Sequence, residues 1–215
     1  MRVVSTSDAG AVDETVAVLV RGGMALVPTD TVYGLAVRPG DGKSVDRVFA
    51  AKGRPAERNL PVLASSIEQV RALGVEFSEV ADALAGKWWP GALTVVFGFD
   101  RGAVRAEWLA GRDEVAVRLP DIGFLRRVMD RAGVLLVTSA NVHGAPTPAV
   151  ALDAALSLLD PPDIVVDAGL LEGTPSTLVN VAVSPPRVER AGPLPPGELA
   201  ALGIAGIEDA GGPAG

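Results

Sequence analysis

The sequence predicts a single α/β domain built on a twisted, mixed sheet. Amphipathic stretches with a helical period alternate with short apolar runs that glycine and proline bound. Several apolar runs follow one another without a helix between them, which a strict alternation of parallel strands and helices would not produce. Of the 215 residues 48% are hydrophobic and 21% charged, which is a globular composition. We expect one domain over residues 5–198 and a Gly/Ala-rich C-terminal tail over 199–215 that frays.

The first half of the chain alternates helices with strands. The run that ends at Val27 is closed by Gly23 and Pro28 and predicts a buried strand. Ser44 is the expected N-cap of the second helix. The expected helices span 11–21, 44–51, 66–73 and 78–87, and the expected strands span 24–27, 35–37, 60–64 and 93–99.

The second half contains more strands than helices. A helix over 149–159 is expected to stop before the pair Pro161 and Pro162, because a residue that precedes proline is pushed out of the helical region. The other expected helix spans 122–131, and the expected strands span 115–119, 134–137, 164–166, 177–181 and 187–190. The consecutive late strands are the reason to expect a mixed sheet.

Composition excludes several classes of site. The chain has no cysteine, so it forms no disulfide, thiolate zinc site or cysteine nucleophile, and its single histidine excludes a multi-histidine metal site. No apolar run approaches the ~20 residues that span a bilayer, and the first residues do not resemble a signal peptide, so we expect a soluble cytoplasmic protein with no membrane partner. The net charge of −7 argues against a dedicated nucleic-acid binder, although a local basic cleft would still offer tRNA a site.

Polar residues follow buried strands at several places, and ligands of open α/β sheets bind beyond the carboxyl ends of strands. PTDTVYGLAV, at 28–37, offers threonine hydroxyls and a carboxylate, and Thr31 is one of them. VTSANVHGAPTP, at 137–148, places Ser139 and Asn141 at a strand exit, and GTPSTLVNV, at 173–181, brings Ser176 just before a strand. Each segment is equally open to interpretation as a turn stabilised by its own polar side chains.

Three cations lie within seven residues at the end of the second expected helix: Lys52, Arg54 and Arg58. A single cation at a helix C-terminus is stabilised by about 0.3–1 kcal/mol, which explains one of them better than three. Arginine makes forked contacts with phosphate or carboxylate. We therefore favour an anion-binding site here over helix capping.

Two familiar sites are incomplete. The GKS sequence at 42–44 matches the end of a phosphate-binding loop, but Val37 stands where its leading glycine belongs. Ser139 and His143 would form a hydrolase pair, but the G-x-S-x-G turn around such a serine is missing. Phosphate binding, if present, has to rely on side chains.

Taken together, seven segments in order resemble the YrdC-like family in its short, single-domain form: PTDTVYGL, KGRP, WPGALTVVF, VAVRLP, SANVHGAP, STLVNV and VERAG. The resemblance implies a twisted mixed-sheet domain with a concave, locally basic ligand surface. It also implies a nucleotidyltransferase that makes threonylcarbamoyl-AMP from L-threonine, bicarbonate or CO2, and ATP, with release of pyrophosphate. A separate threonylcarbamoyl-transferase complex would then use the product for the threonylcarbamoyladenosine modification of tRNA.

The resemblance also implies roles for particular residues. Threonine would be held by Thr31, Arg118, Ser139 and Ser176. The nucleotide would be held by Lys52, Arg54, Arg58, Asn141 and Arg190, of which Lys52 and Arg54 would be catalytic. Mg2+ would arrive with ATP rather than in a carboxylate cage, and no organic cofactor is expected.

Three positions depart from the family pattern, because Leu63, His143 and Asn180 stand where other members carry different residues. The departures leave two alternatives open. One is a non-catalytic RNA-binding protein that uses the same surface, and the other is a divergent paralogue that makes another carbamoyl-adenylate.

Overall fold

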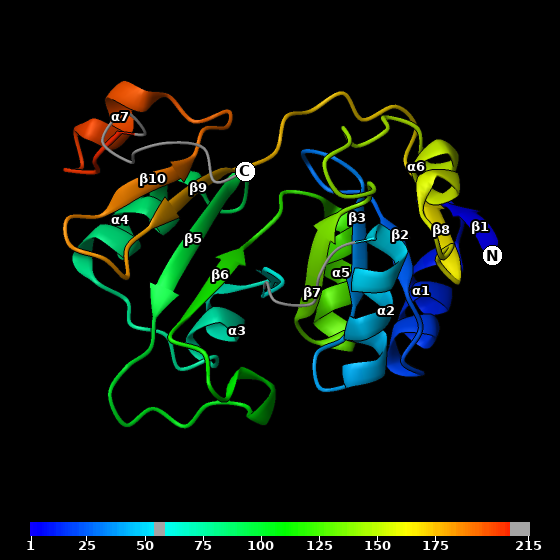
Figure 1. The fold of residues 1–215 in the computed structure, drawn as a ribbon, viewed down its shortest axis with the longest axis horizontal. Coiled ribbons are helices and arrows are strands. Elements are labelled where there is room, and N and C mark those ends of the chain that lie inside the picture. Colours follow the sequence, from blue (N-terminus) through cyan, green and yellow to red (C-terminus); the bar gives the residue numbers. More distant parts are fainter. Residues whose placement is uncertain (54–58, 207–215) are drawn as a thin grey trace.

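A computed structural model describes residues 1–53 and 59–206 and shows one strongly twisted sheet with helices packed against it (Figure 1). Within the described residues the sheet has ten strands in the order β1-β8-β2-β3-β7-β4-β6-β5-β9-β10. The strands are β1 (Arg2–Ser5), β2 (Ala25–Val27), β3 (Gly34–Val37), β4 (Val62–Leu63), β5 (Leu93–Gly98), β6 (Glu114–Arg118), β7 (Leu135–Ser139), β8 (Ile164–Asp167), β9 (Thr177–Asn180) and β10 (Arg187–Arg190).

The helices lie between these strands in sequence. They are α1 (Ala11–Val20), α2 (Gly42–Lys52), α3 (Ile67–Arg71), α4 (Glu79–Trp88), α5 (Gly123–Ala132), α6 (Ala151–Ser157) and α7 (Pro196–Ala200), with a 3-10 turn, η1 (Glu107–Leu109). Parallel pairs join β1 to β8, β8 to β2, β4 to β6 and β5 to β9, and the other neighbours are antiparallel. The predicted mixed α/β sheet is therefore confirmed.

In the half of the sheet formed by β1, β8, β2, β3 and β7, the four strands β8, β2, β3 and β7 are covered on both faces. Alternate side chains of a strand point to opposite faces. In β2, Leu26 packs in one cluster with Val48 of α2 and residues of α6, whereas Ala25 packs in a second cluster with Leu19 of α1 and Val128 of α5. These strands are apolar on both faces for this reason, as the sequence predicts.

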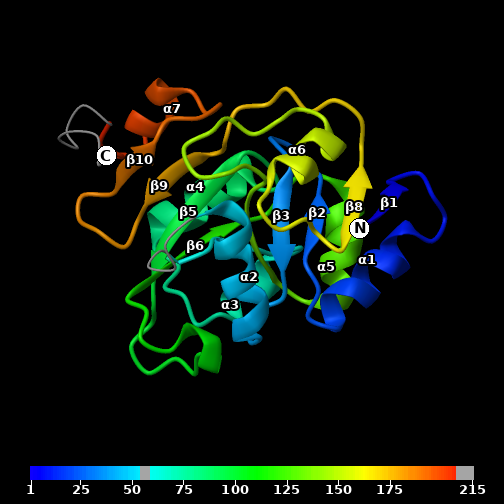
Figure 2. The same ribbon diagram turned by 45° about the vertical axis from the view of Figure 1, so that its right-hand side comes forward.

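The half formed by β6, β5, β9 and β10 is covered on one face only. Val95 and Phe97 of β5 pack with Leu84 of α4 in the larger core cluster. The alternate residues of the same strand, Thr94 and Val96, face a pocket instead. Figure 2 shows the two halves of the sheet turned relative to one another, with α4 beside the second half and α5 and α1 beside the first.

The N-cap of α2 differs from the expected one. Asp41 is the N-cap, and its Oδ1 accepts a hydrogen bond of 3.1 Å from the backbone N of Lys43. Ser44 lies inside the first turn, where its hydroxyl donates to Gly22 O at 2.7 Å. The expectation that Ser44 caps the helix is wrong. Serine and aspartate are both good caps, and here Asp41, directly after Gly40, precedes the first helical turn.

The ordered fold extends past both expected boundaries. Strand β1 pairs in parallel with β8, but it was not predicted because Val4 is its single buried residue. At the other end Ile204 is 4% exposed and Ala205 forms a bridge with Arg187, so the stretch from 200 to 205 packs instead of fraying. Over the described ranges no helix has the length and apolar character needed to cross a membrane.

Candidate functional site

A pocket of about 470 Å3 lies where the two halves of the sheet meet. Strands β3 and β7 line it from the first half, β5, β6, β9 and β10 line it from the second, and Leu63 of the two-residue strand β4 lies between them. The sequence-predicted residues that line the pocket are Thr31, Arg118, Ser139, Ser176 and Arg190. Tertiary structure thus gathers residues that lie up to 159 positions apart, from Thr31 to Arg190.

Three of these residues stand at one end of the second half of the sheet. Strand β6 ends at Arg118 and β10 ends at Arg190, whereas Ser139 ends β7, which runs antiparallel to β4 and therefore to β6. Ser176 stands immediately before β9, which runs parallel to β5. The polar residues at strand termini that the sequence singles out therefore line one pocket, although they come from strands that run in opposite directions.

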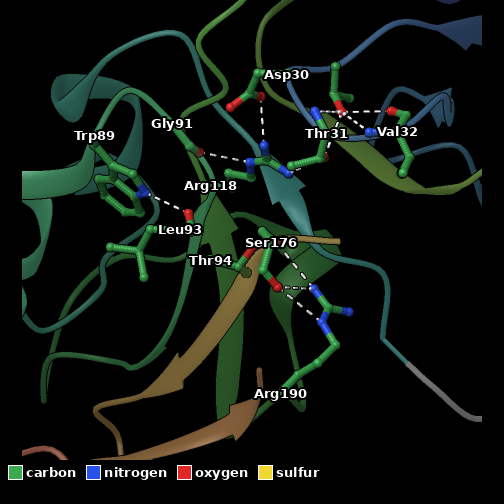
Figure 3. Close-up of polar contacts among 11 residues, drawn as sticks. Asp30, Thr31, Val32, Trp89, Gly91, Leu93, Thr94, Arg118, Ser176 and Arg190 are labelled. Atoms are coloured by element: carbon green, nitrogen blue, oxygen red, sulfur yellow. Dashed lines mark hydrogen bonds and ion pairs between the residues drawn. The ribbon is translucent and has the colours of Figure 1, made fainter. Parts of the chain in front are cut away.

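Arg118 joins two other segments of the pocket's surroundings through its guanidinium group (Figure 3). It is 6% exposed, and its guanidinium donates from Nη2 to Asp30 Oδ1 at 2.6 Å, from Nη1 to Thr31 Oγ1 at 2.8 Å, and from Nε to Gly91 O at 2.9 Å. The ion pair with Asp30 compensates part of the cost of burying the charge. The network joins the second half of the sheet to the loop after β2.

That loop is shaped by Thr29. Its Oγ1 accepts hydrogen bonds from the backbone N of Thr31 and of Val32, each at 3.2 Å, and donates to Val32 O at 2.6 Å. This is the local side-chain-to-backbone pattern of a threonine turn. The turn interpretation holds for Thr29, and Thr31 is presented to Arg118 at the edge of the pocket, where its contact with a ligand stays a prediction.

Ser176 and Arg190 form the opposite wall. The Ser176 hydroxyl lies 2.7 Å from Thr94 Oγ1, and Arg190 Nη2 donates to Ser176 O at 2.9 Å and to its Oγ at 3.1 Å (Figure 3). Register places Arg118, Thr94, Leu178 and Arg190 in one row across four strands. Burial, and secondly the charge of Arg118, lower the pKa of Arg190. Two guanidinium groups thus face a common space, where an anion would relieve their mutual repulsion.

Comparison with known proteins agrees with this geometry. Residues 17–192 match the model of the Sua5/YciO/YrdC family, which carries the description "Telomere recombination". The chain belongs to this family. Among its relatives, the threonylcarbamoyl-AMP synthase of Pyrococcus abyssi is 34% identical over 180 residues, and that of Bacillus subtilis is 33% identical over 167 residues. These alignments cover 83% and 77% of this chain but 53% and 48% of the relatives, so the chain spans about half their length.

A shorter family member matches over most of its length. The putative threonylcarbamoyl-AMP synthase of Mycobacterium tuberculosis is 32% identical over 176 residues, which cover 80% of each chain. Among solved structures, P. abyssi Sua5 complexed with L-threonine superposes with a TM-score of 0.83 at 31% identity, covering 94% of this chain and 60% of that one. Escherichia coli YciO shares the fold at 19% identity, with a TM-score of 0.77 and coverage of 89% and 94%.

Lys52 and Asn141 lie beside the pocket and organise the Sua5/YciO/YrdC segment SANVHGAP. The Lys52 side chain, which is 3% exposed, donates to Asn141 O at 2.8 Å, to Asn141 Oδ1 at 3.3 Å, and to Ser139 O. The Asn141 amide donates to Ala145 O at 2.7 Å. Neither residue is among those that line the described pocket. Direct contact with a nucleotide stays a prediction for both, and Arg54 and Arg58 lie outside the described residues.

Lys52→Met is expected to lower the free energy of unfolding by about 2 kcal/mol, because a hydrogen bond to a charged donor contributes ~1.5–3 kcal/mol. Denaturant unfolding measures this loss, and Lys43→Met on the exposed start of α2 is the matched control. Unchanged stability with lost activity would instead assign the ammonium to phosphate binding alone.

His143 does not form the hydrolase pair with Ser139. It is exposed, and its recorded hydrogen bond is from its backbone N to Lys52 O at 2.9 Å. Within the described part of the chain no hydrogen bond joins its imidazole to the Ser139 hydroxyl. This departure from the family pattern is therefore compatible with the same pocket.

His143→Ala is expected to leave kcat/KM within about twofold of the unsubstituted protein, because exposed substitutions away from packed or paired groups shift free energies by less than ~0.5 kcal/mol. Steady-state synthesis assays across substrate concentrations measure it. Loss of activity in a folded variant would restore a general-base role for the imidazole.

Thr94, Glu114 and Glu189 are among the pocket residues that were not predicted. Alternation in LTVVF places Thr94 opposite the core, a signal that could have identified it. The two glutamates come together only through pairing of distant strands. Asn180 donates to Glu189 Oε1 at 2.8 Å and to Glu114 Oε2 at 3.3 Å. An aspartate at 180 would place a third carboxylate beside the two glutamates and would have no N–H to donate to them. Asparagine at this position therefore suits its two neighbours.

The charged side chains of the described pocket are two arginines and two glutamates. A locally basic surface stays a prediction.

Proposed function

We propose that this chain is a nucleotidyltransferase that makes threonylcarbamoyl-AMP from L-threonine, bicarbonate or CO2, and ATP, with release of pyrophosphate. The observation that carries the proposal is the pocket in which Arg118, Thr31 and Ser176 lie beside Arg190. Groups suited to an amino acid and a cation suited to phosphate face the same space there. The names of the relatives and the threonine complex of P. abyssi Sua5 support the same activity.

The amino acid would be held mainly by Arg118 and two serines. Arginine carries five N–H donors, and three of those on Arg118 are engaged with protein oxygens. Two donors remain for a carboxylate, which is a geometry that guanidinium groups favour. The hydroxyls of Ser139 and Ser176 would bind the threonine hydroxyl or amine.

The chemistry asks the protein for positioning and charge stabilisation. The threonine nitrogen attacks the carbon of CO2 and loses a proton, which gives a carbamate; starting from bicarbonate, a water molecule also leaves. A carbamate oxygen then attacks the α-phosphorus of ATP, and the bond to the bridging oxygen breaks as pyrophosphate departs. The negative charges of the carbamate and the triphosphate repel one another, and preorganised cations lower the free-energy cost of bringing them together. Arg190 would serve the nucleotide from the pocket, together with Lys52, Asn141, Arg54 and Arg58 as the family resemblance implies.

The donor set of the pocket fits Mg2+ that arrives with ATP better than a resident ion. Asp30 is paired with Arg118, and over the described residues no cluster of three or more acidic or histidine side chains is arranged for a metal. Mg2+ keeps several waters and binds phosphate oxygens with few protein carboxylates. When bound, it would screen the triphosphate charge.

The product would leave the protein for a separate threonylcarbamoyl-transferase complex that modifies tRNA, and we place this exchange in the cytoplasm. The mixed anhydride between the carbamate and the phosphate is reactive enough to drive the transfer without further ATP. Direct binding of tRNA would require a basic surface beyond the pocket, whose described charges balance.

The decisive experiment is mass spectrometry of the product formed from ATP, L-threonine and bicarbonate, with pyrophosphate release measured in parallel. Threonylcarbamoyl-AMP should appear only when all three substrates are present. Pyrophosphate released equally fast without threonine would refute the proposal. Product formed preferentially with another amine would favour the paralogue, and tRNA binding without any adenylate would favour the RNA-binding alternative.

A further inference from the structure

The segment over 168–176 crosses from one half of the sheet to the other. It begins after β8 and ends at β9, and Figures 1 and 2 both show it passing between the two halves. Its last two residues, Pro175 and Ser176, line the pocket. The position of the Ser176 hydroxyl therefore depends on how this irregular segment is held.

The start of the segment is held by Tyr33. The ring is fully buried, and its hydroxyl donates to Gly169 O at 2.6 Å and accepts from Ala168 N at 3.0 Å. Burial raises the pKa of Tyr33, which keeps this donor protonated. Tyr33 belongs to the same loop-and-strand segment as Thr31, so the beginning of the crossing segment is tied to the threonine side of the pocket.

The middle of the segment lies directly on the backbone of Thr31. A Cβ built on Gly173 would stand 2.0 Å from Thr31 O and 2.8 Å from its carbonyl carbon. Both are backbone atoms, which cannot turn aside as a flexible side chain would. The φ angle of Gly173 is not in the left-handed region, so the demand for glycine comes from space alone.

The end of the segment is packed in the same way against Gly192, two residues after β10. A Cβ on Gly192 would lie 2.3 Å from Thr177 N, 2.6 Å from the carbonyl carbon of Ser176 and 2.7 Å from Pro175 O. Its φ also lies outside the left-handed region. Any side chain at 192 would displace the backbone that carries Ser176, which Arg190 holds from the same strand end.

We propose that Gly173 and Gly192 are positioning residues for the amino-acid substrate, because the close approach they allow fixes the Ser176 hydroxyl in the pocket. The inference rests on the proposed function, since it assigns that hydroxyl to threonine. Gly192 acts through Ser176 and touches no substrate itself. A methyl group at 192 has to move the chain by roughly 1 Å, and a misplacement of that size is enough to weaken a positioned contact strongly.

The test measures L-threonine affinity by calorimetry, together with kcat and KM for threonine and for ATP, in Gly192→Ala and Gly173→Ala. Threonine Kd and KM should rise by about tenfold or more, which is the scale of one lost buried polar contact, while the KM for ATP moves less. Gly86→Ala is the matched control, because a Cβ on Gly86 of α4 meets nothing within 4 Å, and its threonine affinity should stay within about twofold. Unchanged threonine affinity in both variants would overturn the inference.

A double-substitution cycle separates positioning from general damage. In a Ser176→Ala background, Gly192→Ala should cost much less further affinity, because the hydroxyl that it misplaces is already gone. If Gly192→Ala raises the threonine Kd by the same factor with and without Ser176→Ala, the proposal is overturned. If either alanine variant fails to fold, Tyr33→Phe replaces it, since it releases the start of the segment without adding volume. The same weakening of threonine binding and the same coupling to Ser176→Ala are expected, and independence of the two changes would again overturn the inference.

The outcomes also separate this inference from the proposed function. Unsubstituted protein that binds threonine but forms no threonylcarbamoyl-AMP would refute the proposed reaction, and the affinity series would still decide the role of the glycines. The positioning role alone would be refuted if the unsubstituted protein forms the product and both Gly192→Ala and Gly173→Ala match it in activity and in affinity for L-threonine. Absence of any threonine binding would refute both.

Discussion

Arg118→Lys is expected to lower kcat/KM for threonine by about 100-fold while the protein stays folded, because an ammonium cannot reproduce the forked guanidinium contacts. Arg118 donates at once to Asp30, Thr31 and Gly91, and a lysine of shorter reach would satisfy one or two of these oxygens. The retained positive charge still pairs with Asp30, so the cost of an unpaired buried carboxylate is avoided. Steady-state kinetics with threonine varied, at saturating ATP and bicarbonate, measure the effect.

Arg101→Lys is the matched control for this substitution. Arg101 is exposed in the turn after β5 and does not line the pocket, so the same change of side chain there should leave threonine use unaltered. Thermal melting of both variants shows whether the fold is intact. A normal KM for threonine in a folded Arg118→Lys protein would restrict Arg118 to a structural role in joining the loop after β2 to β6.

Arg54→Lys is expected to reduce synthase activity by about 10²–10³, the usual consequence of removing one donor to a developing transition-state charge. The chain lacks a complete glycine-rich phosphate loop, so side chains have to supply the charge that a triphosphate needs. Arg54 lies outside the described residues, and the expectation rests on its place in KGRP and on the planar pair of donors that lysine lacks.

Helix capping makes the opposite prediction for Arg54. Lysine serves a helix C-terminus nearly as well as arginine, so capping alone would leave both activity and melting unchanged. Measuring the KM for ATP and the single-turnover rate separates binding from chemistry in this variant. Near-normal synthesis by Arg54→Lys, with unchanged melting, would remove the support for a phosphate contact.

Local patterns in the sequence were sufficient for the fold class. Apolar alternation and helical periods are properties of neighbouring residues, and they correctly predict α1, α5, β5 and β6 to within a few residues. These local patterns give the wrong element or boundary where a strand has few buried residues or where two residues could cap the same helix. Strand β1 has one buried residue, and Asp41 and Ser44 are both good N-caps, so tertiary contacts decide each case.

The sequence by itself determined the fold class and indicated which segments are candidates for chemistry, because polar residues that directly follow apolar strands stand out from the surrounding pattern. Together with the family resemblance, which contributed Arg118, it placed Thr31, Arg118, Ser139, Ser176 and Arg190 among the candidates, and the structure brings these five to one pocket. Only the tertiary structure decided how they divide the work. The side chain of Lys52 is directed to the carbonyls of Ser139 and Asn141, Gly192 makes room for the backbone beside Ser176, and Glu114 meets Glu189 through Asn180. Lys52 and Asn141, like Glu114 and Asn180, are distant in the chain, and strand pairing over such distances leaves no periodic trace in a single sequence.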